Sequence, residues 1–493
     1  MAEFDATGRH SATFPRAVDI VDALSTRKIT AVELLRQTYA AIEERNPAVN
    51  AICTLQPLDE VLPQAENIDA ARARGDDLPV LAGIPMAVKD LANTKGIRTT
   101  LGSKIFEHNI PTEDGLMIAR LKSAGAIIIG KTNTPEFGAG SHTFNELFGI
   151  TRNPYDTTRI AGGSSGGAAV ALATGMVCLS DGSDMGGSLR NPAAYCNVVG
   201  FRPTMGRVPS WPQSANRFAR MGLEGPMART VEDCAMLLQV QAGPDPRDRL
   251  SYLPTLGNIS LTGLQRAKTQ GLRLAWAPRP AGLPVEPRIL STLNPMVERT
   301  QRLGCTVEEI ALTELNEAMA VFKTLRAAAY AMLAESVYTR HSKRLKATLA
   351  NNIREGLSLT SDDIYQAEMA RTQIDTKLQE VFKHYDFILM PTTQVMPFSV
   401  DIEYPQSIEG VAMQSYIDWM SICCILSPFD VPCLSLPAGF SEEGLPVGLQ
   451  IVGRFGDDAG VLQLAYAMQE SSPFWQRAPM LDSGSRTPLM AIA

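Results

Sequence analysis

The segment that most constrains the fold is the run AIIIGKTN at residues 126–133, which follows directly on a predicted helix. Helical spacing over residues 114–123 ends at Gly125, and the β-branched residues that come next are typical of a strand buried on both faces. A helix that leads at once into a buried strand is the pattern of proteins in which helices cover a sheet. We therefore expect an α/β fold.

Further strands are predicted at both ends of the chain. LAGIPMAVKD at residues 81–90 places Lys89 at the polar end of a short strand, and FILMP at 387–391, VPCLSLPAG and LPVGLQIVG supply apolar runs near the C terminus. Because strands from both ends would share one sheet, we expect residues 1–493 to form a single large domain. Residues 286–383 are rich in helix-forming residues, which predicts a helical layer or cap within that domain.

One helix has clear predicted ends. Thr30 and Glu33 have the spacing of a capping box, in which each satisfies a backbone N–H group of the first turn, and apolar residues then recur at helical spacing. Asn46 and Pro47 are expected to end this helix.

Composition limits the partners that we expect. The formal net charge is -7, and no block of Lys and Arg marks a surface for nucleic acid. No uncharged apolar run reaches the roughly 18 residues that span a bilayer. Eight cysteines lack the spacing of a metal site, so we expect reduced thiols and no metal. We expect a cytoplasmic protein with a small-molecule substrate and neither nucleic acid nor membrane as partner; a homo-oligomer is left open.

The segment richest in chemistry is AGGSSGGAAVALATGMVCLSDGSDMGGSLRNP at residues 161–192. Two clusters of glycine and serine, GGSSGG and GSDMGGS, flank a short helix of Ala, Val and Leu. Glycine allows the backbone to approach a ligand closely and to adopt φ values that other residues avoid. The clusters therefore predict a pocket lined by backbone N–H groups and serine hydroxyls.

Two other interpretations of GGSSGG fit less well. The segment lacks the GK[ST] ending of a phosphate-binding P-loop and the GxGxxG spacing of a dinucleotide site. It also misses the G-x-S-x-G spacing of the α/β-hydrolase elbow, since the residues are Gly163-Ser164-Ser165-Gly166. None of the five histidines is an evident partner for a serine, so a histidine-based triad is disfavoured.

These motifs, from AGIPMAVKD through GGSSGG and GSDMGGSLRNPAAYC to LPVGLQIVG, resemble the amidase signature family over nearly the whole chain. The resemblance implies an α/β/α sandwich around a large mixed, twisted sheet. It also implies a catalytic lysine, a serine that follows a cis peptide bond and a nucleophilic serine, which match Lys89, Ser164 and Ser188. The intervals of 75 and 24 residues agree with the family's spacing. Ser165 is then a neighbour of the catalytic group.

The sequence departs from the family pattern at four positions outside this trio. Ala168 stands where serine is common, and Met185 where threonine, isoleucine or leucine is usual. Asn197 and Arg202 replace a glycine and a lysine. Met185 is expected to reshape the pocket wall, since only its backbone N–H is needed for the oxyanion.

The expected chemistry is acyl transfer without metal or organic cofactor. Ser188 attacks the carbonyl, Ser164 relays its proton, and Lys89 acts as a neutral base. Burial without a carboxylate partner must lower the pKa of Lys89, and an extended backbone should turn the adjacent Asp90 to the opposite face. We expect the backbone N–H groups of Met185, Gly186, Gly187 and Ser188 to stabilise the oxyanion. Ser165, Asp184 and Arg190 are expected to support the site rather than to react.

Three functions fit this chemistry to different degrees. The first is a stand-alone amidase acting on a small or aryl amide, an ester, or a carbamate such as a urethane. The alternative is the glutaminase (A-type) subunit of a tRNA-dependent amidotransferase, which works only with partner subunits. Apolar segments, including one with Trp211 and Phe218, favour the first. A catalytically silent interaction protein is the third, and the intact Lys89, Ser164 and Ser188 argue against it.

Overall fold

The structure is a computed structural model that describes residues 14–212, 221–252, 259, 261–266 and 268–481. Its strands are β1 Ile52–Leu55, β2 Pro85–Lys89, β3 Ile127–Thr132, β4 Phe144–Asn145, β5 Gly149–Ile150, β6 Leu179–Asp184, β7 Val199–Arg202, β8 Leu223–Ala228, β9 Arg273–Trp276, β10 Thr306–Glu309, β11 Phe387–Pro391, β12 Ser407–Ile408, β13 Val411–Ala412, β14 Cys433–Phe440 and β15 Pro446–Val452. Its α-helices are α1 Ala17–Ser25, α2 Ala31–Val49, α3 Leu58–Arg74, α4 Leu116–Ser123, α5 Gly166–Ala173, α6 Arg190–Cys196, α7 Val231–Gln241, α8 Leu261–Gln265, α9 Pro287–Arg302, α10 Ala318–His341, α11 Ala347–Ser358, α12 Ser361–His384, α13 Ser421–Cys424 and α14 Asp458–Ser471.

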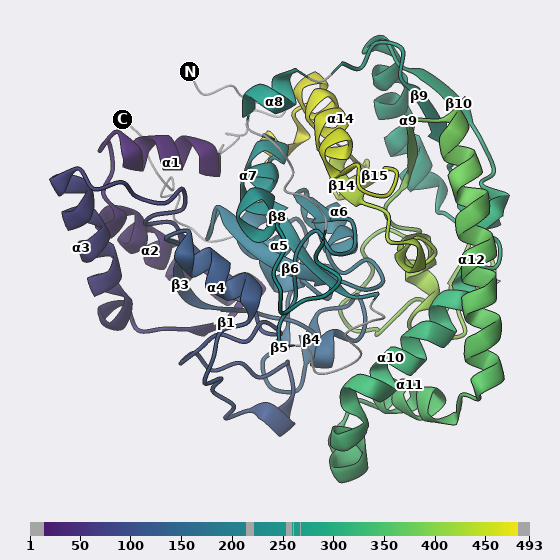
Figure 1. Cartoon of the computed structure of the whole chain (residues 1–493), viewed down its shortest axis with the longest axis horizontal. Helices are drawn as coiled ribbons and strands as arrows, with labels where there is room; N and C mark the ends of the chain where they lie inside the picture. Colours follow the sequence, from purple (N-terminus) through teal and green to yellow (C-terminus); the bar gives the residue numbers. More distant parts are fainter. Residues whose placement is uncertain (1–13, 213–220, 253–258, 260, 267, 482–493) are drawn as a thin grey trace.

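A large mixed sheet forms the centre of the molecule, as the α/β prediction requires (Figure 1). Its eight strands follow the order β10-β9-β11-β15-β14-β7-β8-β6. The first three strands pair in parallel, whereas the remaining pairs are antiparallel. Nearly every residue of β14 and β15 is buried, since helices pack over the sheet.

The strands near the N terminus form a second sheet, in the order β1-β3-β2. The expectation that strands from both ends share one sheet is therefore wrong. Strand β2 still lies beside β6, although no backbone ladder joins the two strands. Hydrogen bonds between buried side chains of β6 and the backbone of β2 connect them instead. The Ser180 hydroxyl donates to the carbonyl of Ala87 at 3.0 Å, and Asp181 accepts the N–H of Lys89 at 2.9 Å. This connection joins the lysine strand to the large sheet.

The N-terminal prediction for helix α2 is confirmed, and its C-terminal prediction is wrong. Thr30 and Glu33 form the capping box. The helix continues through Pro47 to Val49. Pro47 cannot donate to the preceding turn, but its fixed φ is helical and the N–H of Asn50 still bonds to the carbonyl of Asn46 at 2.7 Å. The helix ends at Asn50, whose left-handed backbone closes the last turn.

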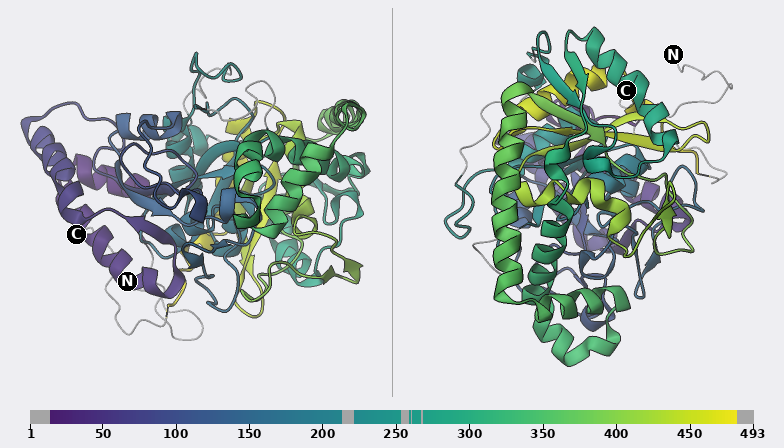
Figure 2. Two further views of the ribbon diagram at one scale, coloured as in Figure 1. Left: turned by 90° about the horizontal axis from the view of Figure 1, so that it is seen from below. Right: turned by 90° about the vertical axis from the view of Figure 1, so that its right-hand side faces the viewer.

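The segment predicted as a helical layer contains α9, α10, α11 and α12. The short strand β10 interrupts it, which the periodicity did not predict. In Figure 1, α10, α11 and α12 lie on the right of the molecule, and Figure 2 shows the length of α12 from the side. The division of the chain into one domain with a cap stays a prediction. None of the described helices combines the length and apolar character needed to cross a bilayer.

Candidate active site

Lys89 lies at the end of β2 and is almost completely buried, with 1% of its surface exposed. Its Nζ atom is 2.8 Å from the hydroxyl oxygens of both Ser164 and Ser165, and 3.0 Å from that of Ser183. A neutral amine has two hydrogens and one lone pair, so it can donate to two hydroxyls and accept a proton from the third. The arrangement suits a base that receives the proton of Ser164.

Ser164 is held by a tightly packed turn after a cis peptide bond with Gly163. A Cβ atom on Gly163 would lie 2.7 Å from the Thr143 hydroxyl, so only glycine fits here. The Thr143 hydroxyl itself donates to the carbonyl of Gly162 at 2.8 Å. The cis bond that the family resemblance implies is present.

Burial lowers the pKa of Lys89 to about 7, against the opposing negative charge of Asp181 and other nearby carboxylates. Within the described ranges, no carboxylate lies within ion-pair distance of Nζ. Asp90 turns the other way, and its carboxylate accepts from the backbone N–H and the hydroxyl of Thr100. Lys89 can therefore be neutral near pH 7, as a general base requires.

Ser188 lies in the loop between β6 and α6 and is half-buried. Asp184 fixes this loop on both sides of the serine. Its carboxylate accepts from the N–H of Gly187 at 2.8 Å and of Leu189 at 3.1 Å. The carbonyl of Ser188 also accepts the N–H of Ser165 at 3.2 Å, which ties the two serine segments together.

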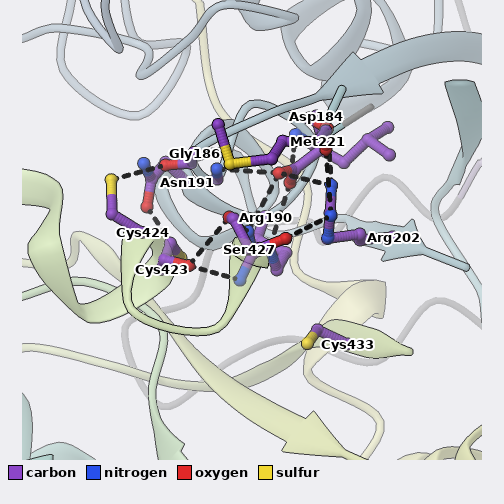
Figure 3. Close-up of polar contacts among 12 residues, drawn as sticks. Asp184, Gly186, Arg190, Asn191, Arg202, Met221, Cys423, Cys424, Ser427 and Cys433 are labelled. Carbon is purple, nitrogen blue, oxygen red and sulfur yellow. Dashed lines mark hydrogen bonds and ion pairs between the residues drawn. The ribbon is translucent and has the colours of Figure 1, made fainter. Parts of the chain in front are cut away.

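Two arginines surround Asp184 in the fully buried network of Figure 3. Arg190 pairs with it at 2.9 Å and Arg202 at 3.6 Å. Burial opposes ionisation of Asp184, but the charge of Arg190, followed by that of Arg202, holds the pKa of this carboxyl well below its usual range. Arg190 also donates to the carbonyl of Cys423 at 3.1 Å and to Gln450 at 2.7 Å. Arg190 thus connects the Ser188 loop to helix α13 and to strand β15.

Three backbone N–H groups in this loop have no hydrogen-bond partner in the part of the chain that the structure describes: those of Met185, Gly186 and Ser188. They are available to an oxyanion. The N–H of Gly187 is committed to Asp184. Gly186 is enclosed on one side, because a Cβ atom there would lie 2.8 Å from Phe322 and 3.1 Å from the Cys424 sulfur. The Cys424 thiol also donates to the Gly186 carbonyl at 3.4 Å (Figure 3).

The structure thus brings Lys89, Ser164 and Ser165 into direct contact and places Ser188 in the adjoining loop. The hydroxyl of Ser188 makes no hydrogen bond to any described residue. The bond from Ser188 to Ser164 that a relay needs is therefore not formed here, and such catalytic bonds commonly tighten when substrate binds. Phe218, which sequence analysis placed near the pocket, lies outside the described residues.

Several supporting residues were missed by sequence analysis. Ser183 completes the hydroxyl shell of Lys89, and Asp181 holds the backbone of that lysine. Ser183 belongs to the second glycine cluster, GSDMGGS, and Asp181 directly precedes it. Their place beside this cluster could have indicated a role in the site. Cys423 and Cys424 belong to α13, more than 230 residues further along the chain, and nothing in the sequence linked them to the Ser188 loop.

The comparisons with known proteins decide the family. A family model described as Amidase matches residues 33–462. The chain belongs to the amidase signature family. A solved amidase signature enzyme, a bacterial aryl acylamidase, superposes with a TM-score of 0.85 at 27% identity, covering 97% of this chain and 100% of that one.

Other amidase signature relatives are components of larger enzymes. The A-type subunit of glutamyl-tRNA(Gln) amidotransferase from Moorella thermoacetica is 34% identical over 491 residues, which cover 94% of this chain and 98% of that protein. The solved structure of the corresponding protein from Thermotoga maritima has a TM-score of 0.73 at 26% identity, covering 93% of this chain and 98% of that one.

These relatives correct the partners expected from composition. The prediction of a small-molecule substrate with no nucleic-acid partner is wrong, because curated relatives are named as subunits of an enzyme of glutamyl-tRNA(Gln). Net charge reports on direct contact between one chain and phosphates, and it carries no information on surfaces that other subunits supply. Among the residues described, no group of three or more His, Cys, Asp or Glu side chains could hold a metal ion.

Proposed function

We propose that the chain hydrolyses a carboxylic amide through an acyl-enzyme on Ser188. The observation that carries this proposal is a buried lysine, with a pKa lowered to about 7, hydrogen-bonded at 2.8 Å to the serine of a cis peptide. Lys89 accepts the proton of Ser164, which accepts that of Ser188 as its oxygen attacks the carbonyl. The N–H groups of the 185–188 loop stabilise the oxyanion.

The second half of the reaction reverses the proton path. The Lys89 ammonium returns a proton through Ser164 to the leaving nitrogen, so the C–N bond breaks and the amine departs. Water then attacks the Ser188 ester under the same base, and the acid leaves with the serine restored. Esters and carbamates, including urethanes, pass through the same kind of tetrahedral intermediate, so they are included among the proposed substrates.

Two substrate classes have specific support. Curated relatives at 34% identity favour glutamine, hydrolysed by the A-type subunit of a tRNA-dependent amidotransferase, and this identity exceeds the 27% shared with the aryl acylamidase. The backbone favours a stand-alone amidase, since the TM-score is 0.85 with the aryl acylamidase and 0.73 with the amidotransferase component. Both classes use the same acyl-enzyme.

A fluorophosphonate probe tests the nucleophile. Wild-type protein should be labelled at one site. Ser188→Ala should not be labelled, and its rate of amide hydrolysis should be lower by on the order of 10³-fold or more. Ser471→Ala, a change of the same type at the end of α14, is the control and should behave as wild type. Labelling of the Ser188→Ala protein would contradict the assignment of Ser188 as the nucleophile.

Substrate class is decided with the purified chain alone. Turnover of 4-nitroanilides without any partner would identify a stand-alone amidase. Glutamine hydrolysis that appears only when the other subunits of an amidotransferase are added would identify the glutaminase subunit.

A further inference from the structure

Asp181, in β6, is a buried carboxylate that takes no part in the proton path of the proposed reaction. Only 1% of its surface is exposed. Among the described residues no basic side chain lies within ion-pair distance of it, whereas its neighbour Asp184 pairs with Arg190 at 2.9 Å. A buried charge without such a partner is costly, so the presence of Asp181 beside Lys89 calls for an explanation.

Strand β6 contacts Lys89 at both ends of the lysine. The carboxylate of Asp181 accepts the backbone N–H of Lys89 at 2.9 Å, and the hydroxyl of Ser183 is 3.0 Å from Nζ. Asp181 is thereby fixed at the base of the lysine side chain, while Nζ lies among the hydroxyls of Ser164, Ser165 and Ser183. The length of the lysine stem separates the two charges.

This separation matters for the proton of Lys89. A carboxylate in contact with Nζ would hold the proton on the lysine at neutral pH and leave no base. Across the stem the attraction is weaker, but water does not screen it because both groups are buried. Burial lowers the pKa of Lys89, and the charge of Asp181 is the largest of those that oppose this change.

Two other carboxylates act on Lys89 from a distance. Asp184 is balanced by Arg190 at 2.9 Å and by Arg202 at 3.6 Å. Glu224 lies on β8, opposite Ser183 in the strand register, and is only half-buried. Solvent therefore screens Glu224, and two guanidinium groups offset Asp184, so Asp181 is the carboxylate whose field on the lysine is least reduced.

Lys131, on β3, helps to keep Asp181 ionised. It is fully buried, and its ammonium donates to the carbonyl of Ala92 at 2.5 Å and to the hydroxyl of Thr94 at 2.9 Å. Burial lowers the pKa of Lys131 to about 8, so it remains largely protonated at pH 7. Burial raises the pKa of Asp181, and the N–H of Lys89 and the charge of Lys131 oppose this rise.

The other ionisable groups that face Lys131 come from three further segments. Asp90, after β2, accepts from Thr100, and these bonds and the charge of Lys131 oppose the rise in pKa that burial gives it. The Cys53 thiol on β1 is neutral, because burial raises its pKa well above the usual range. Lys122 on α4 is balanced by its own ion pair. Asp90 is therefore the second negative charge that Lys131 must offset.

The charges of this buried cluster balance only when Lys89 carries a proton. With Lys89 neutral, the carboxylates of Asp90 and Asp181 face the single ammonium of Lys131, which leaves one net negative charge. When Lys89 accepts a proton, the four groups become neutral as a set. A buried group of charges is less costly when it is neutral overall, so the cluster favours the protonated lysine that the reaction produces.

We propose that Asp181 is the counter-charge of the Lys89 ammonium and sets the strength of this base. The proposal rests on the proposed hydrolysis at Ser188 and adds a positioning residue to it. As the oxygen of Ser188 attacks, the proton of Ser164 passes to Lys89, and Asp181 stabilises the ammonium without exchanging a proton itself.

The test is a pH–rate profile of Asp181→Asn with a neutral amide. Asparagine removes the charge but keeps an oxygen that can accept the N–H of Lys89. The acid limb of kcat/KM should move to lower pH by on the order of one unit. The plateau above it should fall about threefold, because a weaker base transfers protons more slowly. At pH 5 the variant should therefore be about threefold more active than wild type, which a purely structural defect would not produce.

Two further variants complete the comparison. Asp181→Leu removes the charge and the hydrogen bond together, should move the limb in the same direction, and serves if Asp181→Asn does not fold. Asp233→Asn is the matched control. Asp233, on α7, is an equally buried carboxylate that accepts the N–H of Val18 at 2.9 Å, and it is not among the charges that act on Lys89. Its replacement should leave the limb at the wild-type pH.

A second measurement needs no turnover. The difference in free energy of unfolding between wild type and Lys89→Met should begin to rise with pH near 7, where the folded lysine loses its proton and the unfolded one keeps it. In the Asp181→Asn background the same difference should begin to rise on the order of one pH unit lower. Urea denaturation of the four proteins over a series of pH values gives both curves.

Two results would overturn the proposal. One is an acid limb, or a rise in stability, that stays at the wild-type pH or moves upward when Asp181 loses its charge. The other is an equal shift in Asp233→Asn, which would mean that any buried carboxylate has this effect. Failure of the proposed function would look different: no amide would turn over and the fluorophosphonate would not label Ser188, while the stability curves would still report the coupling between Asp181 and Lys89.

Discussion

The Nζ atom of Lys89 lies 2.8 Å from the hydroxyl of Ser164, in a site that excludes nearly all solvent from the lysine. The two residues come from different segments, since Lys89 ends β2 and Ser164 lies in the turn that precedes α5. Burial converts this lysine into a group that can take a proton from Ser164 near neutral pH, and the first two predictions concern this change.

The pH dependence of activity should report the titration of Lys89. Because its pKa is lowered to about 7, kcat/KM should rise about tenfold per pH unit below that value and level off above it. The measurement is a pH–rate profile with a neutral amide, at saturating substrate for kcat and at limiting substrate for kcat/KM. A profile without a limb near pH 7 would contradict the role of Lys89 as the base.

Stability should respond to the same titration. Between pH 7 and about 10.4 the unfolded lysine holds its proton and the folded one has released it, so the unfolded state binds more protons and stability rises with pH. Relative to Lys89→Met, wild-type protein should gain about 2 kcal/mol in free energy of unfolding from pH 7 to 9. Urea denaturation of both proteins at the two pH values measures this difference.

Ser183 should matter although sequence analysis assigned it no role. Ser183→Ala removes one of three hydroxyls around Nζ, and loss of a hydrogen bond of roughly 1 kcal/mol should lower kcat about five- to tenfold. The limb of the pH profile should also shift, which a purely structural role would not produce. Ser180→Ala, which removes a hydroxyl bonded only to the backbone of β2, is the control for strand packing and should leave the limb in place.

Asp184→Asn should both destabilise the protein and inactivate it. The change leaves Arg190 buried without its counter-charge, which typically costs about 3–5 kcal/mol, and weakens the acceptor for two N–H groups beside Ser188. Chemical denaturation and amide turnover measure the two effects. Glu380→Gln, in an exposed pair with Lys383, should change the free energy of unfolding by less than about 1 kcal/mol.

Gly186→Ala tests the packing behind the oxyanion loop. Its methyl group would meet Phe322 at 2.8 Å and Cys424 at 3.1 Å, so the loop must move. Overpacking of this kind costs about 1–3 kcal/mol, and displacement of the N–H donors should lower kcat more than it raises KM. Adding Phe322→Leu should recover part of kcat. If the double variant is no better than Gly186→Ala, the contact with Phe322 is not the cause.

Local features of the fold could be predicted because neighbouring residues decide them. The capping box of α2 and the strand at 127–132 depend on spacing and side-chain type within a few residues. The short strands β9 and β10 were not predicted, since four residues with mixed burial carry little periodicity. The assignment of β2 to a separate sheet was also out of reach, because pairing depends on partners far away in the chain.

The sequence by itself determined the candidate chemistry of this protein: a lysine, two serines and a glycine-rich loop whose order and spacing resemble the amidase signature family. Tertiary structure decided the environment that makes the chemistry work. Burial lowers the pKa of Lys89, Asp184 orients the loop around Ser188, and Cys424 and Phe322 close in on Gly186 from distant segments.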